Sequence, residues 1–342
     1  MPTPKRRCVV RASAFLVTII GTHTTRATEN GQSHADLAYI DVLAGFPLQP
    51  GFYLRDDLNY NFSNRFNDQN GKKVSVSAGV LGSHPVKFLS SNVANVVAAA
   101  YVPDATIPVL GATFGASMYG FYAVSRAEAQ FAIAGQTQGS GETRQGLGDL
   151  TIVPLFLQWT IAKANLYIKL SPFEFTAPIG EYNSKDQIGN NIGLNYWSYR
   201  PALLITWLNS SNELSFNIGN SLNSTNPATD YKSGDEVYFT YVAQRYLSRN
   251  FALGIEGYYY RQITNDTRNG TTVNTTPQSN PFQSEDPLNE GPGNRGETFA
   301  LGPTISYNPT ENVFLNAHWV HEVFSYNRKQ GDSIWVRAAF RF

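Results

Sequence analysis

The chain has 342 residues, of which 42% are hydrophobic and 13% aromatic, so it is long enough for one large domain or two ordinary ones. It carries 26 basic and 26 acidic residues, and this balance gives no basic excess that would favour nucleic acid as a partner. No apolar run reaches about 18 residues, which argues against a membrane-spanning helix. A membrane β-barrel has a similar average polarity, because half of each strand faces a polar interior.

Residues 1–27 have the features of a secretory signal peptide. Basic residues 5–7 precede a short apolar stretch, and a small-residue cleavage site ends at Ala27. Arg11 interrupts the apolar stretch, so a disordered basic leader is the alternative. Cys8 is the only cysteine, and the mature chain would therefore depend on size and backbone pairing rather than on disulfides.

Residues 28–50 form an N-terminal segment that is richer in apolar side chains than a free linker would be. We expect it to enter the lumen of a barrel as a plug, with a short helical turn at residues 35–44. The apolar side chains that favour this interpretation are Leu37, Tyr39, Ile40, Val42, Leu43, Phe46 and Leu48.

Residues 51–342 have the alternating apolar and polar pattern of strands joined by turns. The third strand is the weakest prediction, because its length and glycines could hide a bend, and we keep it as one strand. The twelve predicted strands lie at 51–63, 86–100, 107–135, 147–160, 164–178, 196–209, 212–222, 235–246, 250–264, 296–308, 313–326 and 331–342.

The connections between these strands alternate between long and short, and only residues 327–331 break the trend. A soluble sandwich has no reason to separate loop lengths in this way, whereas outer-membrane barrels have short periplasmic turns and long extracellular loops. We therefore predict an all-β fold, a single antiparallel transmembrane β-barrel of about 12 strands in the bacterial outer membrane. Its two rims are the short-turn end, with the short connections, and the long-loop end, with the long ones. An even strand count places both ends of the barrel domain at the short-turn, periplasmic end.

The alternation also predicts which polar side chains face the lumen. Two interpretations stay open for them, namely internal ion pairs that close a narrow barrel, and a path on which rings and arginines contact an aromatic solute. Residues 150–157 are apolar on both faces, so either the lumen is partly apolar there or the N-terminal segment packs against it. The predicted lumen and substrate-path residues are Lys169, Arg200, Glu256, Tyr258, Tyr260, His318, Glu322, Arg337 and Arg341.

The last strand ends in SIWVRAAFRF, which places Arg337 and Arg341 inside and a terminal aromatic residue, Phe342, on the lipid-facing set. The same alternation places Trp335 inside, although a tryptophan is more often an anchor at the membrane interface.

No pattern in the chain predicts catalysis, a metal site or a cofactor. His318 and Glu322 are four residues apart on a strand, which separates them by about 13 Å, too far to share one metal ion. His321 falls on the lipid-facing set, and no Gly-x-Ser-x-Gly elbow accompanies it. We therefore expect a protein that is not an enzyme.

Several separated stretches, taken in order, resemble one protein family over roughly residues 50–342. These are GLGDLTIVPLFLQW (146–159), GLNYWSYRPALLITWL (193–208), NPATDYKSGDEVYF (226–239), GYYYRQIT (257–264), ALGPTISY (300–307) and HWVHEVFSYNRKQGDSIWVRAAF (318–340). The chain resembles the putative MetA-pathway of phenol degradation family. The resemblance implies an outer-membrane barrel with the architecture of hydrocarbon channels, and it implies that the barrel-assembly machinery reads Phe342 as part of its signal.

These observations together predict a passive uptake channel for small hydrophobic or aromatic compounds, surrounded by outer-membrane lipid. Two alternatives stay open, an outer-membrane enzyme or accessory protein of phenol degradation, and a structural or adhesive barrel with ligand-binding loops. The loop at residues 265–295 is unusually long for the family, and this leaves the solute open.

Overall fold

The computed structural model describes most of the chain after residue 30. The described ranges are 31–35, 37–77, 83–133, 136–186, 189–273 and 295–342. The expected signal peptide, residues 1–27, lies outside the described residues.

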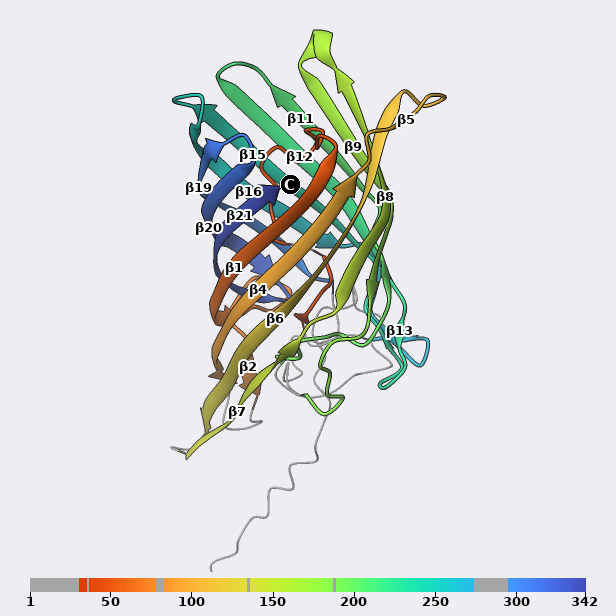
Figure 1. Cartoon of the computed structure of the whole chain (residues 1–342). Helices are drawn as coiled ribbons and strands as arrows, with labels where there is room; N and C mark the ends of the chain where they lie inside the picture. Colours follow the sequence, from red (N-terminus) through yellow and green to blue (C-terminus); the bar gives the residue numbers. More distant parts are fainter. Residues whose placement is uncertain (1–30, 36, 78–82, 134–135, 187–188, 274–294) are drawn as a thin grey trace, which may run out of the picture.

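Twelve antiparallel strands form a closed barrel, as the sequence predicts (Figure 1). Each strand pairs with the next one along the chain, and the first pairs with the last from Tyr53 opposite Arg341 to Phe66 opposite Lys329. Among these twelve described strands, closure leaves none at an edge with unpaired backbone groups, which is the condition for crossing lipid. The strands are β1 (Gly51–Phe66), β4 (Lys87–Val102), β6 (Ala112–Ile133), β8 (Leu150–Ile161), β9 (Leu166–Ala177), β11 (Ala202–Leu208), β12 (Asn212–Asn223), β15 (Glu236–Tyr246), β16 (Phe251–Gln262), β19 (Glu297–Thr310), β20 (Val313–Tyr326) and β21 (Lys329–Arg341).

Two details differ from the predicted elements. Residues 136–146 were expected to be a loop, but they belong to strand β7 (Gln136–Leu147), which pairs with the far half of β6. The strand expected at 196–209 is divided into β10 (Ser198–Tyr199) and β11, because Pro201 has no N–H for the ladder. The third predicted strand does stay whole as β6, with a register shift between Gly115 and Ser117.

The separation of short and long connections is confirmed. Four tight connections lie at one rim, at residues 162–165, 209–211, 247–250 and 311–312, with the C-terminus beside them at the top of Figure 1. The short β20–β21 connection, residues 327–328, lies at the opposite rim and is the exception that the sequence also shows. At the opposite rim the long connections form small sheets of their own. These are β2 (Ser75–Ser77) with β3 (Ser83–Pro85), and β13 (Thr225–Asn226), β14 (Tyr231–Lys232), β17 (Thr267–Arg268) and β18 (Thr271–Thr272). A two-residue strand β5 (Thr106–Ile107) extends the β4–β6 connection at the short-turn end.

Lipid-facing and lumen-facing side chains alternate along the strands. On β21, Ile334, Val336 and Phe340 are exposed on the outer wall, whereas Trp335 and Arg337 are buried inside. In the described part of the chain, no helix is long and apolar enough to cross a membrane.

Strand β8 explains why residues 150–157 are apolar on both faces. The β8–β9 register shifts between Ile152 and Leu157, around Pro154, so the alternation resets and both Val153 and Phe156 become buried. Leu48 of the N-terminal segment packs against this cluster. Of the two interpretations left open, the structure therefore supports contact with the N-terminal segment.

Candidate functional site: the lumen and its N-terminal segment

Residues 31–50 run through the inside of the barrel from the long-loop end to the short-turn end. Near one rim, the Gln32 side chain donates to the Asn191 carbonyl at 2.6 Å. Near the other, the Leu48 N–H donates to Gln158 Oε1 at 2.8 Å. The described residues between 35 and 44 form turns and extended backbone, so the expected short helical turn is wrong.

The segment touches the wall closely enough to constrain its own sequence. Gly45 donates its N–H to Thr206 Oγ1 at 2.9 Å, and a Cβ at this position would lie 2.7 Å from the Tyr167 carbonyl. Any side chain at Gly45 would therefore collide with the backbone of the wall, and only glycine fits here without a shift.

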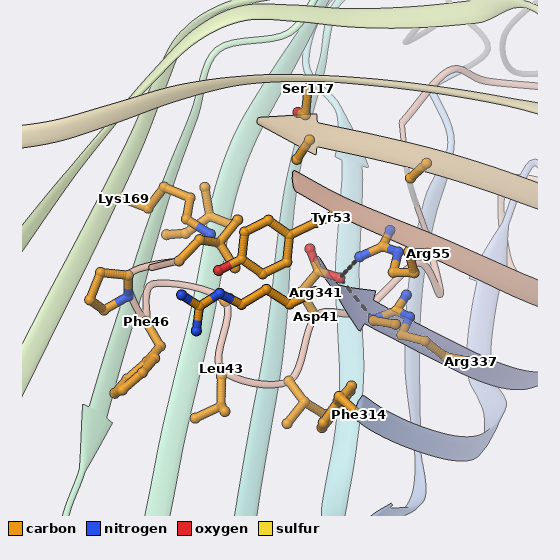
Figure 2. A pocket seen from close by; sticks show the side chains of 18 of the residues that line it. Asp41, Leu43, Phe46, Tyr53, Arg55, Ser117, Lys169, Phe314, Arg337 and Arg341 are labelled. Atoms are coloured by element: carbon orange, nitrogen blue, oxygen red, sulfur yellow. Dashed lines mark hydrogen bonds and ion pairs between the residues drawn. The ribbon is translucent and has the colours of Figure 1, made fainter. Parts of the chain in front are cut away.

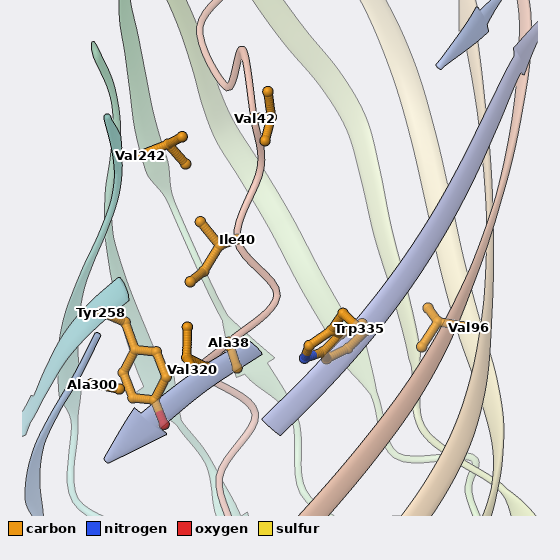
Figure 3. Close-up of a cluster of buried hydrophobic side chains, with 9 residues drawn as sticks. All are labelled: Ala38, Ile40, Val42, Val96, Val242, Tyr258, Ala300, Val320 and Trp335. Atoms are coloured by element: carbon orange, nitrogen blue, oxygen red, sulfur yellow. The ribbon is translucent and has the colours of Figure 1, made fainter. Parts of the chain in front are cut away.

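An apolar cluster fills the middle of the lumen (Figure 3). Alternate residues Ala38, Ile40 and Val42 of the segment are buried against side chains from several strands. The wall contributes Val96, Val242, Tyr258, Ala300, Val320 and Trp335. Trp335 therefore packs against the segment inside the barrel and is not an anchor at the membrane interface.

A neutral network of four charged side chains lies between this cluster and the short-turn end. Arg337 contacts Asp57 directly across the β1–β21 ladder at 2.8 Å, and it also contacts Asp41 of the segment at 2.8 Å. Arg55 contacts the same two carboxylates, Asp41 at 2.9 Å and Asp57 at 3.1 Å. Both guanidinium groups lie within 5.1 Å of the centre of the Tyr39 ring. Two cations and two carboxylates thus compensate each other and hold the segment to the wall.

Two predicted lumen residues, Glu256 and His318, contact each other with both side chains fully buried. The distance from His318 Nδ1 to Glu256 Oε1 is 3.0 Å, and His318 Nε2 lies 3.1 Å from the Ala38 carbonyl of the segment. The two residues come from β16 and β20, with β19 between them. Gly302 lies opposite Glu256 on β19, where a Cβ would lie 1.7 Å from the Trp319 carbonyl oxygen, so the position has no room for a side chain.

The long-loop end of the lumen contains carboxylates that accept hydrogen bonds from tyrosines. Tyr258 donates to Glu322 at 2.9 Å, and Tyr260 donates to Glu236 at 2.6 Å. Ser33 of the segment also donates to Glu236, at 2.7 Å. Arg328, from the β20–β21 turn, stacks on the Tyr260 ring at 4.3 Å from its centre.

Among the long loops beyond this layer, Asp266 is fully buried. It accepts hydrogen bonds from the Tyr231 hydroxyl at 2.6 Å and from the Gly234 N–H and the Gln262 amide at 2.7 Å each. Burial raises the pKa of Asp266 to about 7, and the nearby Glu236 carboxylate also raises it. The loop layer therefore contains a carboxyl group that titrates near neutral pH.

Another buried group joins the segment to the wall near the long-loop end. His34 Nε2 lies 2.9 Å from Asp149 and His34 Nδ1 lies 2.7 Å from the Ser198 hydroxyl. The Ser198 hydroxyl is 2.7 Å from Asn223 Oδ1, to which it donates. On the same part of the wall, Arg200, which follows β10, contacts Glu174 of β9 at 3.4 Å.

A cavity of about 690 Å³ lies at the short-turn end, between the segment and the wall. Lys169 from β9 and Arg341 from β21 extend into it (Figure 2). The Lys169 ammonium lies 5.6 Å from the centre of the Phe156 ring, and Arg341 Nη2 donates to the Pro50 carbonyl at 3.0 Å. Lys169 and Arg341 therefore face a cavity, whereas the other predicted lumen residues contact oppositely charged or hydrogen-bonding groups.

The remaining predicted residue, Phe342, lies at the rim and is 74% exposed. Its N–H donates to the Phe52 carbonyl at 2.9 Å, so the chain end closes the β1–β21 ladder.

Sequence reasoning missed several partners of these groups. Asp57 and Arg55 follow the alternation of β1 and could have been found in the same way as the other lumen residues. Asp41 and His34 lie outside any strand, and no periodicity signals them. Within the described ranges, no group of three or more histidine, cysteine, aspartate or glutamate side chains could hold a metal ion.

The fold is similar to that of a known channel. The COG4313 outer membrane channel from Pseudomonas putida F1 superimposes with a TM-score of 0.63 at 15% identity, over 89% of this chain and 100% of that one. The CymD monoaromatic hydrocarbon channel gives 0.39 at 11% identity, over 86% and 89% of the two chains. The Ralstonia pickettii toluene transporter TbuX gives 0.38 at 9% identity, over 94% and 97%. No curated protein sequence is significantly similar to the chain.

The closed barrel and its segregated loops are those of a bacterial outer-membrane protein, and the short connections are expected at the periplasmic side. A family model matches residues 63–338, which is most of the chain. The predicted resemblance is confirmed, and the chain belongs to the family described as Putative MetA-pathway of phenol degradation.

Proposed function

We propose that the protein is a passive uptake channel for small hydrophobic or aromatic compounds and serves aromatic catabolism. The observation that carries this proposal is the cavity of about 690 Å³, where Leu43, Phe46, Leu48, Val153 and Phe156 present apolar surface inside a closed barrel. A cavity of roughly 150 Å³ already binds benzene in a protein core. The space is therefore sufficient for a single-ring solute, and the family's association with phenol degradation agrees with such a solute.

We further propose that the N-terminal segment, residues 28–50, acts as a plug. Its contacts with the wall support this role, since they run from the His34–Asp149 contact to the bond between Leu48 and Gln158. The predicted path residues Glu256, His318 and Arg337 all bond to the segment or to the wall. In the plugged state they hold the segment, and a solute would meet them only after the segment moves.

An enzyme is the second candidate, because Ser198, His34 and Asp149 are arranged as a serine, a histidine and an orienting acid. Three observations disfavour catalysis by this group. Ser198 is only 1% exposed, its hydroxyl donates to Asn223, and none of the three residues lines the cavity. We propose that the group is a structural anchor and that uptake involves no covalent step.

Uptake by intact cells tests the channel proposal. Cells lacking the gene should accumulate labelled toluene and benzyl alcohol more slowly than the same cells carrying it on a plasmid. A plasmid coding for an unrelated outer-membrane barrel controls for general leakiness. Equal rates with and without the protein, for every aromatic compound tried, would overturn the proposal.

A further inference from the structure

Cationic side chains outnumber carboxylates around the cavity at the short-turn end. The lining contains five cationic residues, Arg55, Lys169, Arg249, Arg337 and Arg341, and three carboxylates, Asp41, Glu174 and Glu311. The excess of two positive charges is unusual for a cavity that otherwise presents mainly apolar surface, because charge inside a protein is normally matched by opposite charge.

The ion pairs of the lining residues show which side chains carry the two excess positive charges. Asp41 is shared by Arg55 and Arg337, and Glu174 faces Arg200. In the part of the chain that the structure describes, neither Lys169 nor Arg341 makes an ion pair. The lining also contains Arg249 and Glu311, which are one charge of each sign. The excess of two positive charges therefore corresponds to Lys169 and Arg341, and both are among the residues that the sequence alternation places inside.

The two cations extend into the same space from different parts of the wall. Lys169 stands on β9, opposite Leu204 and Gln158, whereas Arg341 stands on β21, opposite Tyr53 of β1. Figure 2 shows the ammonium and the guanidinium pointing toward one another beside the Tyr53 ring. The guanidinium is held in place by its hydrogen bond to the Pro50 carbonyl, so its remaining N–H groups stay available to a ligand.

Apolar surface lies directly beside this pair. The Phe156 ring is 5.6 Å from the Lys169 ammonium, and Leu48 and Val153 pack around Phe156. A ligand that fits both features has a ring for the apolar wall and one compact anionic group for the two cations. Inorganic anions would satisfy only the second feature, and neutral aromatic compounds only the first.

We propose that Lys169 and Arg341 form a binding site for the carboxylate of a small aromatic acid, whose ring lies against Phe156. The inference rests on the proposed channel function and narrows its solutes to include anionic aromatic compounds. A carboxylate accepts charge-assisted hydrogen bonds from both cations, and these bonds are stronger than those of neutral groups. The site lies at the periplasmic rim, where a solute would leave the barrel.

Equilibrium dialysis of the refolded full-length chain in a non-ionic detergent tests the site without requiring transport. The probes are benzoate, which has both features, benzyl alcohol, which lacks the charge, and acetate, which lacks the ring. We expect benzoate to bind more tightly than either of the others at neutral pH. Lys169→Met and Arg341→Met should each weaken benzoate binding about tenfold and leave benzyl alcohol binding unchanged.

Two further variants protect this test from misfolding artefacts. Lys169→Arg keeps the positive charge and should retain most benzoate binding. Lys163→Met removes a lysine from the exposed turn at the same rim, outside the cavity lining, and should bind benzoate as the unaltered protein does. Each variant is compared only when it gives the heat-modifiable band of a folded barrel.

The possible results separate this inference from the channel proposal. Benzoate binding that is no tighter than acetate or benzyl alcohol binding, or that survives both methionine substitutions, would overturn the aromatic-acid site. That result would not affect the uptake of neutral compounds, which the cell assay measures. Conversely, specific benzoate binding without any uptake would retain the site and contradict the channel.

Discussion

The long-loop end and the short-turn end of the lumen differ in how their buried charged groups are compensated. At the long-loop end, Glu236 and Glu322 accept hydrogen bonds from tyrosines, and Asp149 contacts His34 of the segment. At the short-turn end, Lys169 and Arg341 face a cavity without a carboxylate partner among the described residues. A carboxylate that already accepts hydrogen bonds needs no ligand, whereas a cation that faces a cavity can form charge-assisted hydrogen bonds to an anion. The comparison indicates one closed end and one receptive end.

Removal of residues 31–50 should produce the largest effect, because it abolishes the difference between the two ends. A barrel of twelve strands encloses a wider lumen than one of eight, whose side chains already fill the interior. We expect the conductance of the refolded protein in planar bilayers to rise several-fold relative to the full-length chain. Equal conductance of both proteins would show that the segment does not limit passage.

Arg337→Met should be the most destabilising of the single substitutions, because Asp57 and Asp41 would keep their charges without this partner. Loss of one partner of a buried ion pair costs about 3–5 kcal/mol in free energy of unfolding. Urea unfolding in detergent measures this change. Arg126→Met is the matched control, since Arg126 is exposed and pairs with Glu128 on the surface, where about 1 kcal/mol or less is expected. Similar values for both variants would contradict the structural role of the network.

Deletion of Phe342 tests the rim of the receptive end. The residue is mostly exposed, so packing alone predicts little loss of stability. If the assembly machinery reads it, the amount of heat-modifiable barrel in the outer membrane should fall severalfold, while Phe342→Tyr, which retains a terminal aromatic ring, should assemble normally. Undiminished assembly of the deletion variant would show that the residue is not part of the signal.

The smallest effect is expected in the loops of the closed end. Because burial raises the pKa of Asp266 to about 7, the folded loops hold this proton more tightly than the unfolded chain does. The resulting stability is present at low pH and is lost as the pH rises through about 7. Proteolytic cleavage of the loops should therefore be faster at about pH 8 than at about pH 5 once the protease's own pH dependence is subtracted.

Asp266→Asn provides the control for this pH dependence. The amide oxygen can accept the bonds from Gly234 and Gln262, and the amide N–H groups can donate to Tyr231, so the loop geometry should survive. The pH dependence of cleavage should then disappear. A variant with the same pH dependence as the unaltered protein would assign it to another group.

The sequence predicts the barrel well because its signals are local and repeated. Alternation along each strand and the succession of loop lengths determine strand number, pairing and facing, and they correctly place Trp335 inside. Two local errors have physical causes, since β7 extends a hairpin beyond the barrel and Pro201 interrupts a strand. Neither feature changes the alternation from which the strands are predicted.

The contents of the lumen are harder to predict. Alternation identifies Arg337 and His318 as inward residues, but it does not say that each contacts the segment. These contacts join residues about as far apart in sequence as the chain allows, and they depend on Asp41 and on the Ala38 carbonyl, which lie in irregular backbone. Periodic patterns contain no information about such positions, so the pairing of the lumen charges emerges only from the structure.

The path of the N-terminal segment has a consequence for biogenesis. The segment is made before β1, yet it bonds to β12 through Glu213 and to the final strand through Arg337. Its binding surface does not exist until the last strand has been added, and contacts of such long sequence separation form slowly. Seating of the segment must therefore coincide with closure of the barrel or follow it. If seating follows closure, a newly inserted molecule passes through a stage in which the membrane contains an unfilled pore, and the rate of seating sets how long that leak lasts.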